Sequence, residues 1–387
     1  MKIGLLIDSM IGGGAERVTL NLAEGFRRKG HAPQLILVRR QIQHQLPDWL
    51  PVHSLSEDGQ LCRNALLNKL MLAWRLRRLV QQLESDGERF AFFISNAEDA
   101  DRLSFIAGLS KVYVRYRNSM REYFQHKLGR KTGAKRLFRW LKWRTRFRLE
   151  YSGRHLVTVS DALQAELIRD MGIRPASMVT IYNPFDFSRL RRLAEARPRP
   201  LERPYIVYAA KLDRRKRQDV LLEAFAQSRA RQTHMLVLLG DTYTDSDRIW
   251  LDELHALIAR LGLQDKVLLP GFQHNPYPWV RHASLFAMSS DSEGLPTVLI
   301  ESLILGTPVV STDCPTGPRE ILTGELARFL CPRNAPAELA NRIDAALAYY
   351  PVIDEARLQR FTADYAIERY LRHCAPKAQT PGQLALP

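Results

Sequence analysis

Short apolar runs separated by amphipathic stretches recur along the chain and predict alternating strands and helices. Residues 2–8 are almost continuously apolar, as in a strand buried inside a parallel sheet. A glycine turn, a helix over 16–29 and a strand over 33–38 follow, so the chain opens with a βαβ unit. The other elements predicted in this half are strands at 90–95, 111–116 and 155–160 and a helix at 161–171, which begins at Ser160 or Asp161.

A second α/β pattern begins at residue 205, after a segment over 189–203 that is rich in Arg, Pro and Ala and predicts a linker. Its predicted strands lie at 205–209, 235–240, 266–270, 284–288 and 307–311, and its predicted helices at 219–231, 247–261, 277–283 and 297–305. The pattern therefore predicts an α/β protein whose two Rossmann-like domains, 1–188 and 204–360, face each other across a cleft. We expect a helix at 361–374 to pack back on the first domain and 375–387 to be a disordered tail.

Length and composition agree with two globular domains. The 387 residues suffice for two domains of ordinary size, and the hydrophobic fraction of 45% is typical of a soluble protein. No apolar run approaches the roughly 20 residues that span a bilayer, and Asp8 interrupts the first run too early for a secretory signal. The four cysteines lack metal-ligand or disulfide spacing, so we expect a cytoplasmic protein.

The most informative stretch runs from Asp291 to Glu301. It places Glu293 in a loop after a strand and Glu301 two turns into the following helix, whose first position suits Pro296. Open α/β sheets bind ligands at the carboxyl ends of their strands, and the free N–H groups at a helix N-terminus bind phosphate. The arrangement therefore predicts a nucleotide-sugar site, in which two carboxylates bind hydroxyl groups and amides bind the diphosphate between them.

Several segments also carry a family pattern. The stretch 271–322 holds a Glu-x7-Glu element with a Glu-Gly-Leu-Pro core, and shorter motifs lie at 12–17, 157–160, 181–186 and 211–216. With these motifs the sequence resembles glycosyltransferase family 4, retaining enzymes of GT-B fold, and is similar to members that build lipopolysaccharide or capsule. The resemblance covers nearly the whole chain and implies a nucleotide-sugar donor.

The resemblance implies roles for the residues around the donor. Glu301 would bind the ribose hydroxyls, while Glu293 would bind hydroxyls of the transferred sugar and stabilise positive charge near its anomeric carbon. Lys216 and Lys211 would stabilise the negative charge that develops on the departing diphosphate, although the family usually has Arg at the second position. The remaining donor contacts would come from Gly294, Leu295, Pro296 and Thr297 and, across the cleft, from Gly13 and Gly14.

Each of these roles has a structural alternative. The lysines could belong to a solvated basic loop, and either glutamate could be a helix acid favoured by the helix dipole. The glycines could form a plain turn between strand and helix. Their spacing is not Gly-x-Gly-x-x-Gly, so a nicotinamide site is a poor match.

The acceptor side departs from the family pattern. Many members have a His at the end of the strand that corresponds to 112–116, whereas this chain continues with Arg117 and Asn118. Arg117 would bind an anionic acceptor, and Asn118 fits the family pattern. Asn183 either lies near the hinge and cleft or builds an Asx turn.

No metal and no cofactor are expected beyond the UDP-sugar substrate. The pairs Asp99/Asp101 and Asp245/Asp247 imitate the Asp-x-Asp motif of metal-dependent transferases, but such pairs are common in turns. The resemblance implies a metal-free enzyme in which Lys, Arg and helix amides take the place of the cation.

Positive charge is concentrated in a predicted amphipathic helix within 127–151. Residues 127–148 hold ten of the basic residues and no acid, and without them the net charge of +16 would fall to +6. Trp140, Trp143, Phe147 and Tyr151 form a helical stripe among cations that include Arg139, Lys142 and Arg146. We expect this helix to bind an anionic membrane surface; packing of the stripe on the first domain is the alternative. Nucleic acid is not an expected partner, because no nucleic-acid-binding module accompanies the charge.

Together with the resemblance, which implies the retaining outcome, these observations predict a glycosyltransferase. It would move a hexose or N-acetylhexosamine from a UDP-sugar to a lipid-linked glycan at the inner face of the cytoplasmic membrane. The alternatives are a nicotinamide-dependent oxidoreductase and a non-catalytic adaptor for membranes or nucleic acid.

Overall fold

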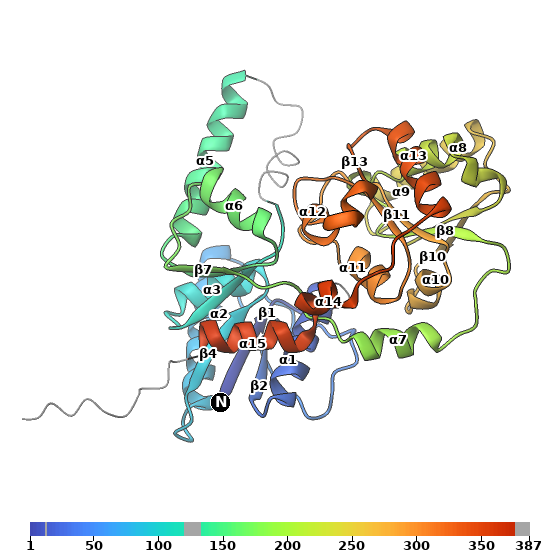
Figure 1. Ribbon diagram of the computed structural model, residues 1–387. Coiled ribbons are helices and arrows are strands. Elements are labelled where there is room, and N and C mark those ends of the chain that lie inside the picture. Colours follow the sequence, from blue (N-terminus) through green and yellow to red (C-terminus); the bar gives the residue numbers. More distant parts are fainter. Residues whose placement is uncertain (12–13, 120–132, 376–387) are drawn as a thin grey trace, which may run out of the picture.

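The computed structural model describes residues 1–11, 14–119 and 133–375, which form two α/β domains side by side (Figure 1). The N-terminal sheet has seven parallel strands in the order β3-β2-β1-β4-β5-β6-β7. Its strands are β1 (Lys2–Ile7), β2 (Ala32–Arg39), β3 (Val52–Ser56), β4 (Phe90–Ser95), β5 (Val112–Tyr116), β6 (His155–Thr158) and β7 (Ser177–Thr180). Its helices include α1 (Gly14–Arg28), α2 (Ala65–Leu83), α3 (Glu98–Ile106), α5 (Gly133–Tyr151) and α6 (Asp161–Arg169).

The C-terminal sheet has six parallel strands in the order β10-β9-β8-β11-β12-β13. They are β8 (Tyr205–Ala209), β9 (Met235–Leu239), β10 (Val267–Gly271), β11 (Leu285–Met288), β12 (Val309–Thr312) and β13 (Leu330–Cys331). The helices around this sheet are α8 (Gln218–Gln227), α9 (Asp245–Arg260), α10 (Tyr277–Arg281), α11 (Thr297–Ile304), α12 (Pro318–Ile321) and α13 (Pro336–Ala348), with short 3-10 turns η1 (Arg214–Lys216), η2 (Arg229–Gln232) and η3 (Gly324–Phe329). The prediction of two Rossmann-like domains is confirmed.

In both sheets the order of strands reverses at one place, between β1 and β4 in the first and between β8 and β11 in the second. Helices diverge to opposite faces at such a point and leave a crevice at the carboxyl ends of the strands. All six residues of β1 and all four of β11 are buried, which explains why these strands are continuous apolar runs in the sequence. The two crevices therefore lie at the ends of well-packed strands.

The chain crosses between the domains twice, and the two crossings are paired. The first crossing leads into α7 (Phe187–Glu195), and the second follows α14 (Glu355–Leu358) and the turn η4 (Gln359–Phe361). The Phe185 amide donates to the Phe361 carbonyl at 2.9 Å, and the Ala363 amide donates to the Phe185 carbonyl at 2.9 Å. The hinge is thus a pair of hydrogen-bonded backbones.

The last helix, α15 (Ala363–Cys374), packs on the N-terminal domain, although it follows the C-terminal domain in the sequence (Figure 1). Arg28 at the end of α1 and Lys29 just after it form ion pairs with Asp364 at 2.9 Å and Glu368 at 3.1 Å. Beneath these pairs the ring of Phe26 contacts that of Tyr370 in an edge-on geometry. This helix therefore completes the core of the first domain.

The predicted linker over 189–203 is in part a helix. Asp186 caps α7 by accepting a hydrogen bond from the Arg189 amide at 2.9 Å, and Leu190 and Ala194 are buried. The predicted linker thus begins with a helix, whose one-sided apolar pattern is obscured in the sequence by three arginines and a nearby proline-rich stretch. The strand β3 and the helices α2 and α3 were not predicted. The tail 376–387 lies outside the described residues.

Candidate functional site

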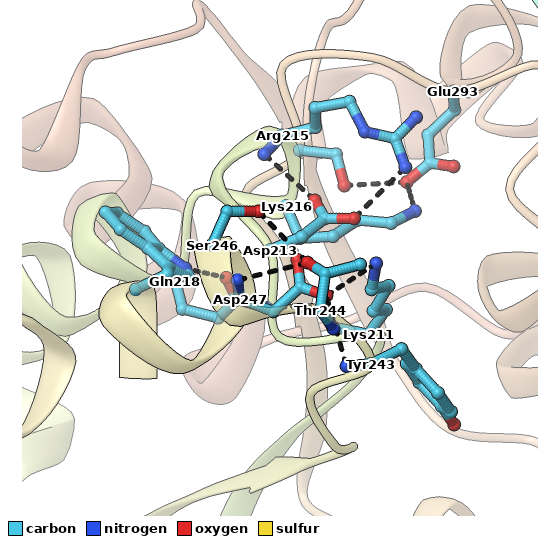
Figure 2. Close-up of polar contacts among 12 residues, drawn as sticks. Lys211, Asp213, Arg215, Lys216, Gln218, Tyr243, Thr244, Ser246, Asp247 and Glu293 are labelled. Atoms are coloured by element: carbon cyan, nitrogen blue, oxygen red, sulfur yellow. Dashed lines mark hydrogen bonds and ion pairs between the residues drawn. The ribbon is translucent and has the colours of Figure 1, made fainter. Parts of the chain in front are cut away.

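Glu293 and Lys216 form an ion pair at the end of the C-terminal sheet (Figure 2). Glu293 stands in the loop between β11 and α11, and its Oε1 accepts hydrogen bonds from Lys216 Nζ at 2.6 Å and from Ser290 Oγ at 2.6 Å. The side chains of Lys216 and Glu293 are 19% and 13% exposed, so each is shielded from bulk water yet still reachable. The sequence prediction that both belong to one site agrees with this contact.

The turn that carries Lys216 is held against the donor loop by its backbone. Asp213 caps η1 by accepting the Arg215 amide at 3.0 Å. The Lys216 carbonyl accepts a hydrogen bond from Ser289 Oγ at 3.0 Å, and the Asp291 amide donates to the Arg215 carbonyl at 2.8 Å. These contacts hold the backbone of the turn and do not involve the Lys216 ammonium, which pairs with Glu293.

Lys211 is engaged elsewhere. Its Nζ lies 2.8 Å from Asp247 and 5.7 Å from the centre of the Tyr243 ring (Figure 2). Burial alone would raise the pKa of Asp247, but hydrogen bonds from Lys211, Thr244 and the Tyr243 amide outweigh it and lower the pKa to about 2. Lys211 therefore neutralises the capping carboxylate of α9, and the structure does not pair it with Glu293 as it pairs Lys216.

Glu301 is buried within α11 and contacts the opposite domain. Its Oε1 accepts a hydrogen bond from the Tyr277 hydroxyl at 3.2 Å and lies 3.9 Å from the Arg17 guanidinium, which donates to the same hydroxyl at 2.7 Å. Burial raises the pKa of Glu301, and the nearby Arg17 and the Tyr277 hydroxyl oppose that rise. The sequence assigned no role to Arg17 or Tyr277, because their proximity to Glu301 comes only from the approach of the two domains.

A cavity of about 260 Å³ opens beside this acid, between the domains. Thr297 and Glu301 line it from α11, Gly14 and Arg17 line it from α1, and His274 lines it from the loop after β10. One wall thus combines the N-terminal turn of a helix with a buried carboxylate. Gly13, predicted to face this space, lies outside the described residues.

Gly294 packs against the backbone of the N-terminal domain. A Cβ built on Gly294 would stand 1.8 Å from the Arg117 carbonyl oxygen. The sequence predicted Gly294 as a donor contact, and in the structure the backbone of the other domain lies against it. Leu295 is buried. Pro296 packs against Gly317, whose φ is +96°, so closely that a Cβ built on Gly317 would stand 2.4 Å from Pro296 Cδ. Pro296 is the N-cap of α11 rather than its first residue, so the helix begins at Thr297.

A second contact joins the domains beside this loop. The Glu320 carboxylate accepts hydrogen bonds from the amides of Asp161 at 2.8 Å and Ala162 at 2.9 Å, at the N-terminus of α6. The Tyr182 hydroxyl adds a third hydrogen bond at 3.1 Å. A carboxylate of the C-terminal domain thus caps a helix of the N-terminal domain, where it is favoured by the helix dipole.

The residues predicted to bind an acceptor have different environments. Arg117 and Asn118 follow β5 beside Gly294. Burial and the neighbouring Arg115 lower the pKa of Arg117, while Asp101, Glu16 and Asp8 act in the opposite direction. Asn183 is buried, and its side-chain oxygen accepts a hydrogen bond from Arg115. The structure thus places Asn183 in a buried contact with Arg115 near the crossing, and its acceptor contact stays a prediction.

Helix α5 has its aromatic stripe turned inward. Phe147 is 2% exposed, and its ring stacks on that of buried Tyr151 with centroids 5.7 Å apart. Trp140 and Trp143 are half-buried and pack against the core. The prediction that Phe147 enters a membrane was wrong, because the stripe is the packing face of the helix, the alternative that the sequence left open. Lys142 and Arg146 are exposed and Arg139 is half-buried, and the large apolar side chains exposed on α5 are Leu137, Phe138, Leu141 and Leu149.

The described residues hold no group of three or more His, Cys, Asp or Glu side chains that could bind a metal ion. Asp99 pairs with Arg39 at 3.0 Å, and Asp247 pairs with Lys211, so neither predicted Asp-x-Asp pair is arranged as a ligand set. Over the same part of the chain, no helix has the length and apolarity that a membrane span requires.

Comparison with known proteins connects this site to a family. Residues 12–189 match the family model described as Glycosyltransferase Family 4, and residues 191–360 match Glycosyl transferases group 1. A Campylobacter jejuni relative, N-acetylgalactosamine-N,N'-diacetylbacillosaminyl-diphospho-undecaprenol 4-alpha-N-acetylgalactosaminyltransferase, is 30% identical over 337 residues, 83% of each chain.

Solved structures show the same fold. A glycosyltransferase from Rickettsia africae superposes with a TM-score of 0.72 at 16% identity, covering 96% of this chain and 97% of the other. The Anabaena protein HepE, in complex with UDP, superposes with a TM-score of 0.66 at 21% identity, covering 97% and 96%. Both cover the two domains together, so the expectation of a GT-B fold is confirmed.

Proposed function

Since the chain belongs to glycosyltransferase family 4, whose members are retaining enzymes that use nucleotide sugars, we propose that it transfers a hexose or N-acetylhexosamine from a UDP-sugar to a lipid-linked glycan. The transfer would take place at the inner face of the cytoplasmic membrane, to a lipopolysaccharide core, a capsule precursor or a similar acceptor.

The arrangement along α11 carries the proposal. Glu301 lies inside the helix and, with Thr297 at its first turn, lines the cavity between the domains, while Glu293 precedes the helix and meets Lys216. A nucleotide sugar laid along this helix would place its ribose at Glu301, its diphosphate at the N-terminal amides and its sugar at Glu293. The ribose, the diphosphate and the sugar would then each lie beside a group that can bind them, in the order in which they are linked in the donor.

The ion pair between Lys216 and Glu293 suits the electrostatics of the transfer. When the anomeric C–O bond breaks, negative charge grows on the leaving diphosphate and positive charge grows at the sugar. Lys216 would turn to the diphosphate, and Glu293 would remain beside the sugar to accept its hydroxyls and to face the positive charge. Attack of the acceptor hydroxyl on the same face as the leaving phosphate would retain the configuration, with the phosphate taking the proton.

The relatives support UDP and a lipid-linked acceptor. The Anabaena neighbour was solved with UDP, and the name of the Campylobacter relative describes transfer to an undecaprenol-linked diphosphate glycan. An acceptor of that kind lies in a membrane, which the exposed cations of α5 would approach on its anionic side.

A ligand screen followed by a transfer assay tests this function. We expect UDP to raise the melting temperature more than GDP or ADP, because a ligand bound only by the native state stabilises it. Radiolabelled UDP-sugars incubated with membrane extract should then label the lipid fraction. Stabilisation by NAD and by no nucleoside diphosphate would overturn the proposal, and so would release of free sugar with no label in lipid.

A further inference from the structure

One face of α2 is apolar and open to solvent. The side chains of Leu66, Leu67, Leu70, Met71 and Trp74 are exposed by 69%, 54%, 48%, 43% and 58%. They recur at spacings of one, three and four residues, so they share one side of the helix. We call these five residues the α2 ridge.

The ridge is not a failure of core packing, because α2 has a second apolar face that is buried. Leu72, Ala73, Leu76 and Val80 pack into the domain and are each at most 5% exposed. Single exposed apolar residues are ordinary on protein surfaces, but five on successive turns form a contiguous patch. Such a patch indicates a contact with something outside the domain.

The charges along the segment that carries the ridge are of one sign. Residues 61–83 hold Arg63, Lys69, Arg75, Arg77 and Arg78 and no Asp or Glu. Arg63, Arg77 and Arg78 are exposed, and the guanidinium of Arg78 lies 5.3 Å from the centre of the Trp74 ring. Long aliphatic side chains, a tryptophan and snorkelling cations are the composition of helices that lie in an anionic membrane interface. Protein interfaces are also enriched in Trp, Met and Arg, so an anionic membrane is favoured by the all-cationic charge of 61–83 and by the membrane-bound acceptor of the proposed function.

Neighbouring elements extend the same chemistry. Helix α2 packs on α3, and Arg102 of α3 donates to Glu150 of α5 at 2.8 Å, so the three helices form one layer of the N-terminal domain. On α5, Leu137, Phe138 and Leu141 are exposed beside Lys142. The exposed apolar groups of both helices thus belong to the domain that would receive the acceptor.

We propose that the α2 ridge enters the interfacial region of an anionic lipid bilayer and is a principal membrane anchor of the protein. The inference rests on the proposed function for the presence of a membrane-bound acceptor, and it names the surface that reaches that membrane. It moves the anchor from the aromatic stripe of α5, which packs on the domain, to a helix that the sequence did not single out.

Vesicle binding by the full-length chain tests the ridge. The variant Leu67→Gln/Leu70→Gln/Trp74→Ala should bind vesicles of phosphatidylglycerol and phosphatidylcholine at least ~10-fold more weakly than the wild type, because it loses three interfacial side chains. The matched control is Ile249→Gln/Val352→Gln, which removes exposed apolar residues from the C-terminal domain, where they are 57% and 95% exposed. The control should bind as the wild type does. Pure phosphatidylcholine vesicles should bind all three proteins weakly.

A second measurement reports how deeply Trp74 enters the bilayer. Lipids brominated near the headgroup should quench tryptophan fluorescence in the wild type more than in Trp74→Phe. Equal quenching, or equal vesicle binding by the ridge variant and the wild type, would overturn the proposal. It would also be overturned if the ridge variant kept its vesicle affinity but changed from dimer to monomer in light scattering, because the ridge would then bind a second copy.

The fold and the proposed function are checked separately. The ridge variant should still be stabilised by UDP and should still transfer sugar to acceptor in detergent, since no ridge residue lines the cavity between the domains. Loss of stabilisation by UDP in the wild type itself would count against the proposed function, whereas intact transfer without vesicle binding would count against the ridge alone.

Discussion

The carbonyl oxygen of Arg117 occupies the position that a Cβ on Gly294 would need, 1.8 Å from it. The loop that carries Glu293 and the end of the strand predicted to face the acceptor are therefore in direct backbone contact. The two domains touch at this glycine as well as at Arg17 and Glu320, and their fit at this point depends on the missing side chain of Gly294.

Gly294→Ala should force the domains apart at this point, because the atom in the way is a backbone carbonyl that cannot rotate aside. We expect kcat to fall at least ~10-fold, since misplacement of reacting groups by about 1 Å can cost two orders of magnitude. Steady-state kinetics with the best UDP-sugar will measure it. Ser292→Ala in the same loop serves as the control and should retain activity. Wild-type kcat in Gly294→Ala would show that the contact is not needed for transfer.

Lys216→Ala should lower kcat by ~10²-fold or more while donor affinity changes less, because its ammonium acts mainly on charge that develops in the transition state. Arg214 provides a matched control in the same turn, since it is exposed and pairs with Glu253 instead of Glu293. Arg214→Ala should stay within about 3-fold of the wild type. An equal loss in both variants would mean that the turn, and not the Lys216 charge, is responsible.

Arg17→Gln should weaken UDP binding and change its pH dependence. Removal of this cation would raise the pKa of buried Glu301 further, so the pH below which the carboxylate protonates and loses its ribose contacts would move upward. Isothermal titration with UDP from pH 5 to pH 8 will follow this. The control is Arg28→Gln on the same helix, which pairs with Asp364 and should leave the profile unchanged. A uniform loss of affinity at every pH would rule out the electrostatic coupling.

Asp101 should make the N-terminal domain less stable as the pH rises. Burial raises its pKa to about 7, opposed by Arg154 and Arg117, whereas the unfolded value is near 3.8. Between these values the folded state holds more protons than the unfolded state. The contribution of Asp101 to the free energy of unfolding is therefore fully present below pH ~4 and is lost as the pH rises through about 7. The loss is at most about 4 kcal/mol.

Urea denaturation of Asp101→Asn will test this contribution, because the amide does not titrate. The free energy of unfolding of the variant should vary less than that of the wild type from pH 5 to pH 8. Parallel curves for the two proteins would show that Asp101 does not titrate in this range.

The sequence predicted helices and strands better than it predicted which distant residues lie close together in space. Helix α11 was expected over 297–305 and is observed over Thr297–Ile304, because a proline before it and a glycine after it bound an apolar run. The contact of Lys216 with Glu293 joins residues 77 positions apart, and only the family resemblance suggested that they share a site. The approach of Arg17 to Glu301 had no local signal at all, since it depends on how the two domains meet.

Helix α5 shows why amphipathic faces are hard to assign from a sequence. A stripe of Trp, Phe and Tyr has the same spacing whether it packs on a domain or enters a membrane. Here Phe147 and Tyr151 pack inside, and the exposed apolar residues lie on another side of the helix. Helix α2 has two apolar faces, which gives a weak periodicity, so its boundaries and its exposed ridge both escaped prediction.

The paired crossing at Phe185 and Phe361 also restricts how the two domains can move relative to each other. Two hydrogen-bonded segments restrict twisting and sliding of one domain against the other more than a single connecting segment would. The motion that remains is a rotation of one domain relative to the other about the axis along which the two segments run. A rotation of this kind would separate the contacts of Arg17 with Tyr277 and of Glu320 with α6 together, because both join the two domains.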